Sequence, residues 1–188
     1  MRVILASKSP RRRELLSRIC PDFEIIVSDA DESLPDGLSP SECAEAVAAR
    51  KGAAVAAEQG CDALVISSDT MVEIDGVILG KPESAADAHR MLAMLSGRRH
   101  NVHTGVAVHY RGRAFSGVDT TRVEFRALTD AEIDEYIATG EPMDKAGAYG
   151  IQGKGGALVV GYDGDFDTVV GLSLSLTERL MREAASGD

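Results

Sequence analysis

An aspartate and three hydroxyl side chains follow a short apolar run near the middle of the chain. The run is Ala63-Leu64-Val65-Ile66, and the polar segment after it is Ser67-Ser68-Asp69-Thr70. A continuous apolar run of this length is typical of a central strand that is covered on both faces of a sheet. Ligands of open α/β sheets bind beyond the carboxyl ends of the strands, so Asp69 is well placed to act as a general base. The alternative is a turn or helix-cap aspartate, and position alone favours neither.

A basic segment follows the first apolar run of the chain. Val3–Ala6 predicts a buried strand, and Ser7-Lys8-Ser9-Pro10 leads into a helix that begins with Arg11-Arg12-Arg13. Ser9 has the side chain of an N-cap, and Pro10 stands at the first helical position, where a missing N–H costs nothing. Each arginine in a first turn opposes the helix dipole by about 0.3–1 kcal/mol, which a bound anion would neutralise. The segment therefore predicts a phosphate site, with a solvated basic helix end as the alternative.

The same dipole argument makes a prediction about stability. Because an arginine in the first helical turn is unfavourable, removing Arg12 is expected to weaken anion binding and to stabilise the free protein slightly.

Two lysines and a glycine-rich segment could complete a nucleotide site. Lys51, within a predicted long helix, and Lys81, in Gly80-Lys81-Pro82, carry ammonium groups that could reach a triphosphate, although most lysines are merely solvated. The segment Asp144–Gly153 has glycines spaced for close backbone approach, and its Gln152 has an amide suited to reading a base edge. The segment matches neither the P-loop nor the dinucleotide-binding fingerprint.

Other candidate groups have a simpler structural interpretation. Asp163, Asp165 and Asp167 alternate like the start of a calcium loop, but the glycine of the sharp turn is missing, which favours an ordinary turn. His100 and His103 lack an H-E-x-x-H context, which favours a place in the core or on a strand surface. The chain has no G-x-S-x-G, the usual elbow of serine hydrolases.

The net charge limits the class of partner. The 188 residues include 30 acids and 20 lysines and arginines, for a formal net charge of −10. A field of this sign argues against a bulk DNA-binding or membrane-binding surface, because both partners are polyanions. The charge is uneven: the first 18 residues carry +5 and the other 170 carry −15. One basic corner on an acidic protein suits a small anionic ligand.

Cysteine use and hydropathy predict a cytoplasmic location. Cys20, Cys43 and Cys61 are widely spaced and never form C-x-x-C, so neither a disulfide framework nor a zinc site is indicated. No apolar stretch approaches the ~20 residues that span a bilayer, and the start of the chain lacks the apolar core of a secretory signal. We therefore expect no membrane partner and no nucleic-acid partner.

Helical and strand-like patterns alternate along the chain, which predicts an α/β fold with a mixed sheet. No repeat or linker interrupts the pattern, so residues 1–188 are expected to form one domain. A small hairpin is predicted over Met71–Leu79 with its turn at Asp75-Gly76, and a second hairpin turn is predicted at Arg111-Gly112. The predicted helices cover residues 10–20, 40–59, 84–95, 129–140 and 173–185. The predicted strands cover residues 3–6, 23–27, 63–66, 102–110, 114–125 and 158–160, with an irregular segment at 141–156.

Taken together, the motifs resemble those of the Maf family of nucleoside triphosphate pyrophosphatases. The resemblance covers essentially the whole chain, and the shared segments are Leu5–Leu16, Asp31-Glu32, Lys51, Ser67–Thr70, Gly80–Pro82, Ser96–Val106, Thr139–Gly153 and Val169–Leu174. Two local departures are S-S-D-T where the family often has G-A-D-T, and G-L-S-L where it has G-L-P-L. Both leave the charged groups intact and bear only on local backbone shape.

The resemblance implies a Maf/ITPase-like fold, a mixed twisted sheet flanked by helices in two lobes with a central cleft. It implies hydrolysis of a nucleotide to the monophosphate and diphosphate with a divalent cation, Mg²⁺ or Mn²⁺. It also implies housecleaning of the nucleotide pool and a link to septum formation and arrest of cell division. The sequence leaves open whether the protein forms a homodimer.

Individual roles follow from the resemblance together with the residue types. Asp69 is expected to be the general base, with a place among the metal ligands as the alternative. Asp31 or Glu32 is expected to help hold the metal. The residues expected to clamp the phosphates are Ser7, Arg12, Lys51 and Lys81.

Base specificity is expected to depend on three side chains. Arg11, Thr70 and Gln152 match the subgroup of the family that looks specific for dTTP and UTP, whereas a 7-methyl-GTP subgroup carries Trp, Gln and Glu at these positions. A guanidinium, a hydroxyl and a neutral amide can meet the O2, N3–H and O4 edge of uracil or thymine. Two other functions stay open: a nucleotidyltransferase, whose loop would be expected to contain glycines, and a non-catalytic division regulator that senses nucleotide.

Overall fold

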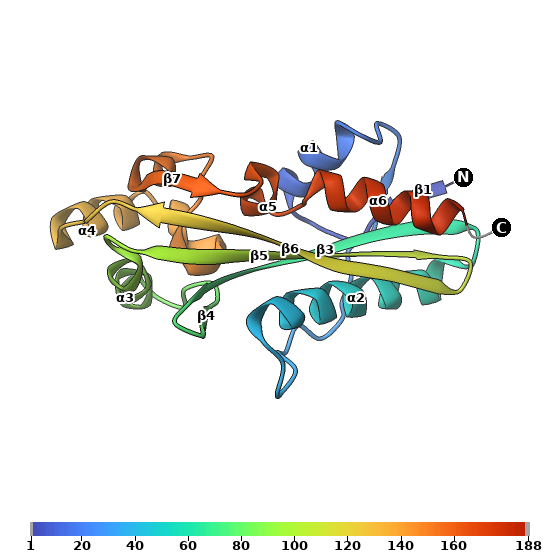
Figure 1. Ribbon diagram of the computed structural model, residues 1–188, viewed down its shortest axis with the longest axis horizontal. Helices are drawn as coiled ribbons and strands as arrows, with labels where there is room; N and C mark the ends of the chain where they lie inside the picture. The colour runs from blue at the N-terminus through green and yellow to red at the C-terminus, as the bar shows by residue number, and fades with distance from the viewer. Residues whose placement is uncertain (1, 187–188) are drawn as a thin grey trace. The chain divides into compact units, whose positions relative to one another are not determined.

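The structure is a computed structural model that describes residues 2–186. Within these residues seven strands form one sheet in the order β2-β1-β3-β5-β6-β7, with β4 paired to β3 (Figure 1). The strands are β1 Arg2–Leu5, β2 Glu24–Ile25, β3 Ala63–Ile74, β4 Val77–Leu79, β5 Arg99–Tyr110, β6 Arg113–Phe125 and β7 Val159–Asp163. The helices are α1 Pro10–Ser17, α2 Pro40–Gln59, α3 Ala85–Leu95, α4 Asp130–Ala138, α5 Phe166–Val170 and α6 Leu174–Ala185.

The expected mixed α/β sheet is confirmed. β1 pairs in parallel with β2 and with β3, whereas β4 pairs antiparallel with β3 and β7 antiparallel with β6. The irregular segment predicted at 141–156 contains three short 3-10 helices, η1 Glu141–Asp144, η2 Ala146–Ala148 and η3 Lys154–Leu158. No helix within residues 2–186 is both long and apolar enough to cross a membrane.

The chain divides into two compact units. Unit 1 comprises the residues up to 70, residues 104–119 and the residues from 171, and unit 2 comprises residues 71–103 and 120–170. The three long strands β3, β5 and β6 each contribute residues to both units.

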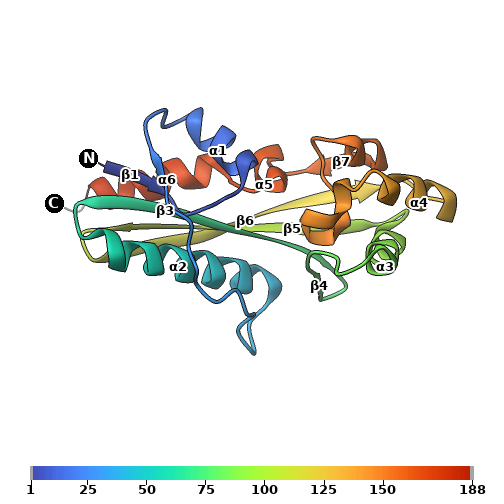
Figure 2. The ribbon, with the colours of Figure 1, turned by 180° about the vertical axis from the view of Figure 1, so that it is seen from behind.

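In unit 1 the sheet is covered by helices on both faces. Figures 1 and 2 show α2 on one face and α6 on the other. A Cβ at Gly105 in β5 would collide with the backbone of Ala44 in α2, so only glycine allows this helix to lie so close to the strand. Gly117 in β6 instead faces Leu176 of α6. The close fit of α2 brings its polar side chains within reach of those on the neighbouring strands.

Local sequence signals explain where the helices begin. Five of them start at a hydroxyl side chain that accepts a hydrogen bond from the backbone two or three residues into the helix. These N-caps are Ser9, Ser39, Ser84, Thr129 and Ser173. Two have a glutamate at the third helical position that completes a capping box.

Several predicted elements have different bounds in the structure, including the following three. The helix predicted over 10–20 ends at Ser17, and the strand predicted over 23–27 is only Glu24–Ile25. The strand predicted over 63–66 continues to Ile74. The apolar run ends at Ile66, opposite Leu5, the last residue of the parallel partner β1. Beyond that point β3 is stabilised by other strands, including β4 opposite residues 72–74.

The two hairpin turns are confirmed. Asp75 and Gly76 have φ angles of 53° and 79°, and Arg111 and Gly112 have φ angles of 49° and 73°. Positive φ at both central residues is typical of the tight turns whose twist matches that of the flanking strands.

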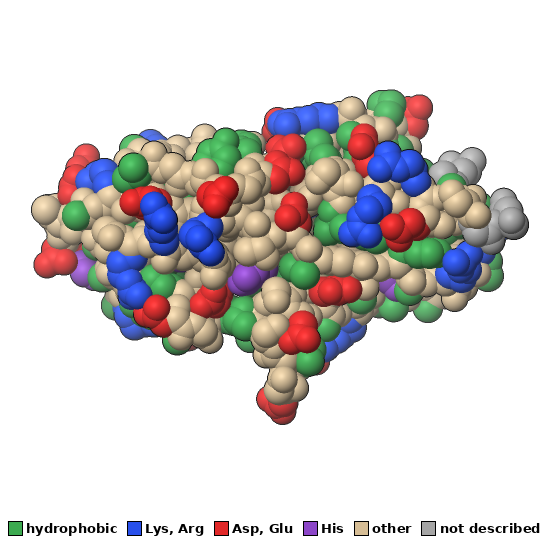
Figure 3. Space-filling view, viewed as in Figure 1, with side chains coloured by type: hydrophobic (Ala, Val, Ile, Leu, Met, Phe, Trp, Pro, Cys, Tyr) green, Lys and Arg blue, Asp and Glu red, His purple; other side chains and the backbone are tan. Residues whose placement is uncertain are grey.

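Surface charges are largely paired locally. Figure 3 shows basic side chains interspersed with acidic ones on the viewed face. In unit 2, for example, Arg98 pairs with Asp75 at 2.6 Å and Arg99 with Glu124 at 2.9 Å. Exposed pairs of this kind contribute at most about 1 kcal/mol each, so they neutralise charge more than they stabilise the fold.

The core of unit 2 contains an aromatic cluster around a buried histidine. The ring centroids of His100 and Phe125 are 5.0 Å apart, and those of Phe125 and Tyr149 are 4.7 Å apart. His100 Nε2 lies 2.8 Å from the Tyr149 hydroxyl oxygen. Its Nδ1 is buried and has no hydrogen-bond partner among the described residues. Burial lowers the pKa of His100 to about 4, because a charged imidazolium would lose its hydration there.

The buried histidine predicts loss of stability on acidification. The pKa of His100 is about 4 in the folded state and about 6.5 in the unfolded chain. This group therefore does not lower the free energy of unfolding above pH 6.5, but it lowers it increasingly as the pH falls from 6.5 toward 4. Between pH 7.5 and pH 5 this group alone should remove about 2 kcal/mol from the free energy of unfolding. Denaturant unfolding at both pH values should show that His100→Phe removes this part of the pH dependence.

The control for this experiment is Tyr149→Phe. It removes the same hydrogen bond but keeps the imidazole, so it should keep the pH dependence of wild type. An equal pH dependence in wild type and His100→Phe would contradict the assignment.

Candidate functional site

The ammonium group of Lys51 lies between two carboxylates in unit 1. Its Nζ is 2.6 Å from Asp69 Oδ1 and 2.8 Å from Glu32 Oε1. The Lys51 and Asp69 side chains are only 10% and 15% exposed, whereas Glu32 is 61% exposed. A buried ammonium needs such partners, because leaving it unpaired away from water would be costly. The three side chains therefore form one charged cluster that is open to solvent on the Glu32 side.

Strand alternation places Asp69 on the α2 face of the sheet. Ala63 and Val65 pack with Val55 of α2, and the Ser67 hydroxyl donates to the Ala48 carbonyl of the same helix. Successive odd positions of a strand share a face, so Asp69 also faces α2. Lys51 precedes Val55 by four residues and lies on the same stripe of the helix.

The next residue, Thr70, faces the opposite side of the sheet. Its hydroxyl lies 3.2 Å from Arg12 Nη2 and 3.0 Å from the hydroxyl of Thr104. Arg12 also donates from Nε to the Gly171 carbonyl at 2.9 Å, and Ser68 donates to the same carbonyl at 2.8 Å. Arg12 is thus fixed in place by two acceptors. Burial lowers the pKa of its guanidinium, and the nearby Asp69 carboxylate opposes that shift.

The turn between β1 and α1 positions the remaining groups of the basic segment. Ser7 is buried, and its hydroxyl oxygen accepts the backbone N–H of Ser9 at 3.2 Å. Ser9 in turn caps α1, as predicted. Arg11 is half-buried on α1. The first turn of α1 contains no acidic residue, so its backbone dipole and its arginines combine into one positive region.

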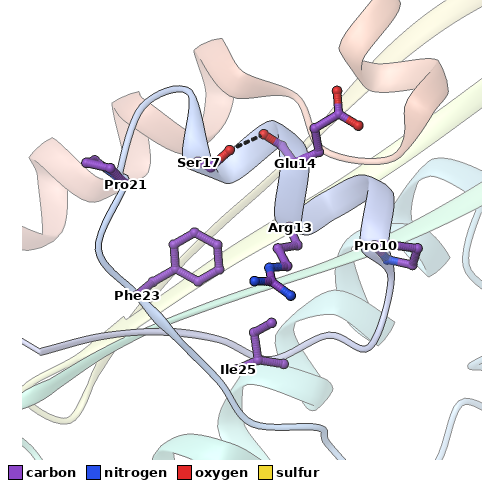
Figure 4. Close-up of a pocket in the computed structure, with 7 residues that line it drawn as sticks. All are labelled: Pro10, Arg13, Glu14, Ser17, Pro21, Phe23 and Ile25. Atoms are coloured by element: carbon purple, nitrogen blue, oxygen red, sulfur yellow. Dashed lines mark hydrogen bonds between the residues drawn. The ribbon is translucent and has the colours of Figure 1, made fainter.

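Arg13 lies on another side of α1. Successive residues of a helix are about 100° apart, so Arg13 is turned away from Arg12. Figure 4 shows its side chain extending toward Phe23 and Ile25, in a surface hollow of about 390 Å³. The hollow is lined by Pro10, Arg13, Glu14, Ser17, Pro21, Phe23 and Ile25. Arg12 and Arg13 are consecutive but have different surroundings. Of the two, Arg12 contacts Thr70 and Gly171, and Arg13 lies in the hollow.

Asp69 lies within a strand and not after its end, contrary to the sequence-based expectation. β3 continues to Ile74, but its parallel neighbour β1 ends at Leu5, opposite Ile66. Asp69 is therefore beyond the carboxyl end of the neighbouring strand, where the chain turns away toward α1. Ligands of α/β sheets bind in such places, so the position is consistent with chemistry although its predicted local structure was wrong.

The carboxylates expected at a metal site are only partly together. Asp31 is exposed, and its oxygens accept the backbone N–H of Ser33 at 2.9 Å and the Ser33 hydroxyl at 2.5 Å. These two hydrogen bonds lower the pKa of the Asp31 carboxyl group. Glu32 and Asp69 instead converge on Lys51. Within residues 2–186 no group of three or more His, Cys, Asp or Glu side chains is arranged to hold a metal ion.

Lys81 and Gln152 belong to unit 2, and both are exposed. Lys81 follows β4, next to Gly80, whose carbonyl accepts the N–H of Gly147 at 3.0 Å. A Cβ at Gly147 would lie 2.9 Å from the Val72 Cβ atom, so this residue must be small. The structure therefore brings together two segments, around Gly80 and Gly147, that are far apart in the sequence.

Sequence reasoning missed three residues of these clusters. Thr104 supports Thr70, and the Gly171 carbonyl holds both Arg12 and Ser68. Gly171 has a φ of 128°, and a Cβ there would lie 3.4 Å from Arg12 Nε. Glu141 binds the backbone of the glycine-rich segment. Thr104 and Gly171 lie in segments that resemble the family, but only the fold reveals their contacts.

Comparison with known proteins identifies the family. A family model described as Maf-like protein matches residues 2–184. A protein from Moorella thermoacetica named dTTP/UTP pyrophosphatase is 53% identical over 182 residues, which is 96% of this chain and 93% of that protein. A protein of the same name from Bacillus velezensis is 50% identical over 97% of this chain and 96% of its own length.

Two solved structures share the fold at low sequence identity. The Ham1 protein of Staphylococcus aureus has a TM-score of 0.50 and 19% identity, covering 66% of this chain and 72% of that one. A nucleoside-triphosphatase / dITP/XTP pyrophosphatase from Mycobacterium abscessus has a TM-score of 0.50 and 15% identity, covering 99% and 95%. The expected Maf/ITPase-like sheet flanked by helices is thereby confirmed. Because the family model matches residues 2–184, nearly the whole of this chain, the chain belongs to the Maf family.

Proposed function

We propose that this protein is a nucleoside triphosphate pyrophosphatase that hydrolyses dTTP and UTP to the monophosphate and diphosphate. The observation that carries the proposal is the Lys51 ammonium between the Asp69 and Glu32 carboxylates. Two relatives that align over nearly the full length of this chain are named dTTP/UTP pyrophosphatase, and these names support the proposed reaction and substrates. Such a hydrolase acts on an acid anhydride and would remove unwanted pyrimidine nucleotides from the precursor pool.

Asp69 is the proposed general base. Its Oδ1 is held at 2.6 Å by Lys51 Nζ, which leaves the second carboxylate oxygen to accept a proton. The oxygen of a water molecule forms a bond to a phosphorus of the triphosphate as its proton moves to Asp69. The bond from that phosphorus to the oxygen that bridges the α- and β-phosphates breaks, so the monophosphate and the diphosphate separate.

Ser7, Arg12 and Lys51 are the proposed phosphate ligands of unit 1. Arg12 uses two of its five N–H groups on Gly171 and Thr70, so three are left for phosphate oxygens. Lys51 uses two of its three protons on carboxylates. The Ser7 hydroxyl accepts from Ser9 and can donate its own proton. We assign Lys81 of unit 2 the same role.

A divalent cation, Mg²⁺ or Mn²⁺, fits the donor chemistry of Glu32 and Asp69. Their oxygens approach a single positive centre, Lys51 Nζ, within 2.8 Å, so they can share a cation. Mg²⁺ is commonly bound by one or two carboxylates together with substrate phosphates. When bound, the metal would neutralise charge on the departing diphosphate. Asp31 is left out of this set, because its carboxylate is engaged by Ser33.

Removing the proposed base should abolish turnover and preserve the fold. Asp69→Asn keeps the shape of the side chain and leaves Lys51 paired with Glu32, but an amide cannot accept the proton. We expect kcat for dTTP to fall by about 10²–10⁴-fold, with nucleotide binding and melting temperature largely retained. Diphosphate release by pure protein with Mg²⁺ or Mn²⁺ measures the effect.

Asp62→Asn, at an exposed carboxylate just before β3, is the matched control. Near-wild-type turnover of Asp69→Asn would exclude the general-base role.

Two neighbouring arginines provide a second test. Arg12→Ala should raise KM for dTTP by about 10- to 100-fold, because charge-assisted hydrogen bonds to phosphate are lost. It should also lower the free energy of unfolding by about 1–3 kcal/mol, since the hydrogen bonds to Gly171 and Thr70 disappear. This replaces the slight stabilisation predicted from the helix dipole alone. Arg13→Ala makes the same charge change in the hollow of Figure 4 and should affect neither quantity much. Equal effects of the two variants would show that only net charge matters.

The proposed base readers, Arg11, Thr70 and Gln152, predict an order of substrates. Turnover should be highest with dTTP and UTP. CTP should be a poorer substrate, with about 1–3 kcal/mol less transition-state stabilisation, because its exocyclic amine replaces an acceptor with a donor. Gln152→Glu should lower kcat/KM for dTTP, since a donor facing a carbonyl oxygen becomes an acceptor. A preference for ATP or 7-methyl-GTP in a nucleotide panel would overturn the base assignment and leave the pyrophosphatase reaction standing.

A further inference from the structure

The carboxylate of Glu141 is bound by the segment that carries Gln152. Its Oε2 accepts the backbone N–H of Lys154 at 2.9 Å, and its Oε1 accepts that of Gly155 at 3.1 Å. The Tyr136 hydroxyl donates to Oε1 at 2.9 Å. All these residues belong to unit 2. One carboxylate therefore holds two consecutive backbone groups just after Gln152.

The electrostatics favour an ionised Glu141. Burial by itself raises the pKa of this carboxyl group, but the N–H donors of Gly155 and Lys154 and the Tyr136 hydroxyl outweigh burial and lower it. Hydrogen bonds to an ionised acceptor are stronger than those between neutral groups. The backbone of Glu141 is itself held in place, because Lys145 donates from Nζ to the Glu141 carbonyl at 2.7 Å.

The glycines of the segment fit closely around these side chains. A Cβ at Gly153 would lie 2.5 Å from both carboxylate oxygens of Glu141, and one at Gly155 would lie 2.5 Å from the Tyr136 hydroxyl. The Tyr136 hydroxyl also accepts the N–H of Gly150 at 3.1 Å. The glycine spacing that suggested close approach to a ligand thus also permits close approach to Glu141 and Tyr136.

Gln152 lies between these attachment points. It is exposed in a turn, and its side chain has no hydrogen bond within the part of the chain that the structure describes. Gly150 on one side is bound by Tyr136, and Lys154 on the other side is bound by Glu141. The backbone around Gln152, and not its own side chain, therefore determines where its amide is presented.

We propose that Glu141 is a positioning residue for base selection. It fixes the backbone of residues 150–155 and thereby the location of the Gln152 amide. The inference rests on the proposed role of Gln152 in reading the pyrimidine edge. Glu141 acts through Gln152 and touches no reacting atom.

The direct test is Glu141→Gln. The amide keeps one oxygen acceptor and turns the other into an N–H₂ donor facing a backbone N–H, so one attachment is lost. We expect KM for dTTP to rise about tenfold with kcat within about twofold, and the kcat/KM ratio of dTTP to CTP to fall about tenfold. Amide hydrogen exchange of residues 150–156 should become faster without a change elsewhere. Glu135→Gln, at an exposed glutamate of α4, should change none of these quantities.

A double-mutant cycle with Gln152→Ala separates positioning from general damage. If Glu141 acts through Gln152, adding Glu141→Gln to Gln152→Ala should change the dTTP-to-CTP ratio by less than about twofold. Fully additive effects on that ratio would overturn the positioning role and leave the proposed function intact. An unchanged ratio in Gln152→Ala alone would overturn the base-reading role of Gln152, and this proposal with it. Should Glu141→Gln fail to fold, Tyr136→Phe removes a neighbouring attachment and is expected to lower the same ratio.

Discussion

A strand can direct successive side chains only to opposite faces of its sheet, and the chemistry of this protein depends on that constraint. Ser67 and Asp69 face α2, whereas Ser68 and Thr70 face the side of Gly171 and Arg12. One short stretch of β3 therefore supplies a carboxylate to one cluster and a hydroxyl to another. A shift of one residue in the register of β3 would exchange the two sets, so the long pairing of this strand also protects the site.

Electrostatic balance imposes a second condition on the same region. Lys51 is buried on α2 and is tolerable there because Asp69 and Glu32 flank it. In the proposed reaction these two groups are already together before a nucleotide binds, so they need little reorganisation. The position next to Lys51 must be glycine, because a Cβ at Gly52 would lie 2.5 Å from the Ser67 hydroxyl. The close packing of α2 on the sheet and the position of the Lys51 charge therefore depend on each other.

Features that depend on a few neighbouring residues were predicted correctly from the sequence. Hydroxyl N-caps such as Ser9 and Ser84, and the turn at Asp75-Gly76, are where the residue types indicated, because each depends on a few neighbouring residues. The extent of β3 was not predictable in this way. The polar residues Ser67–Thr70 interrupt the apolar pattern, so the strand predicted at 63–66 and the hairpin predicted at 71–79 were not expected to be continuous. Pairing with other strands of the sheet keeps this stretch extended.

In the candidate site, too, some contacts are made by neighbouring residues and others by residues far apart in the sequence. Asp31 and Glu32 are adjacent carboxylates with different partners. Ser33, two residues further along, engages the first, whereas only the fold brings Lys51 to the second. Glu141 lies in the Thr139–Gly153 segment that resembles the family, but nothing near it in the sequence indicates its role, since an acid beside glycines is typical of a solvated loop. Its role depends on backbone N–H groups thirteen and fourteen residues further along the chain.

These observations suggest why one fold can serve different bases. Three of the four groups assigned to the phosphates, Ser7, Arg12 and Lys51, lie in unit 1, and Lys81 lies in unit 2. Of the proposed base readers, Arg11 and Thr70 lie in unit 1, whereas Gln152 lies in unit 2, on a glycine-rich turn held by Glu141 and Tyr136. Changing residues on that turn alters what is presented to a base and leaves the helices and strands of unit 1 untouched. Phosphate chemistry is the same for every nucleotide, so a turn that presents one of the proposed base readers can change specificity without rebuilding the residues assigned to catalysis.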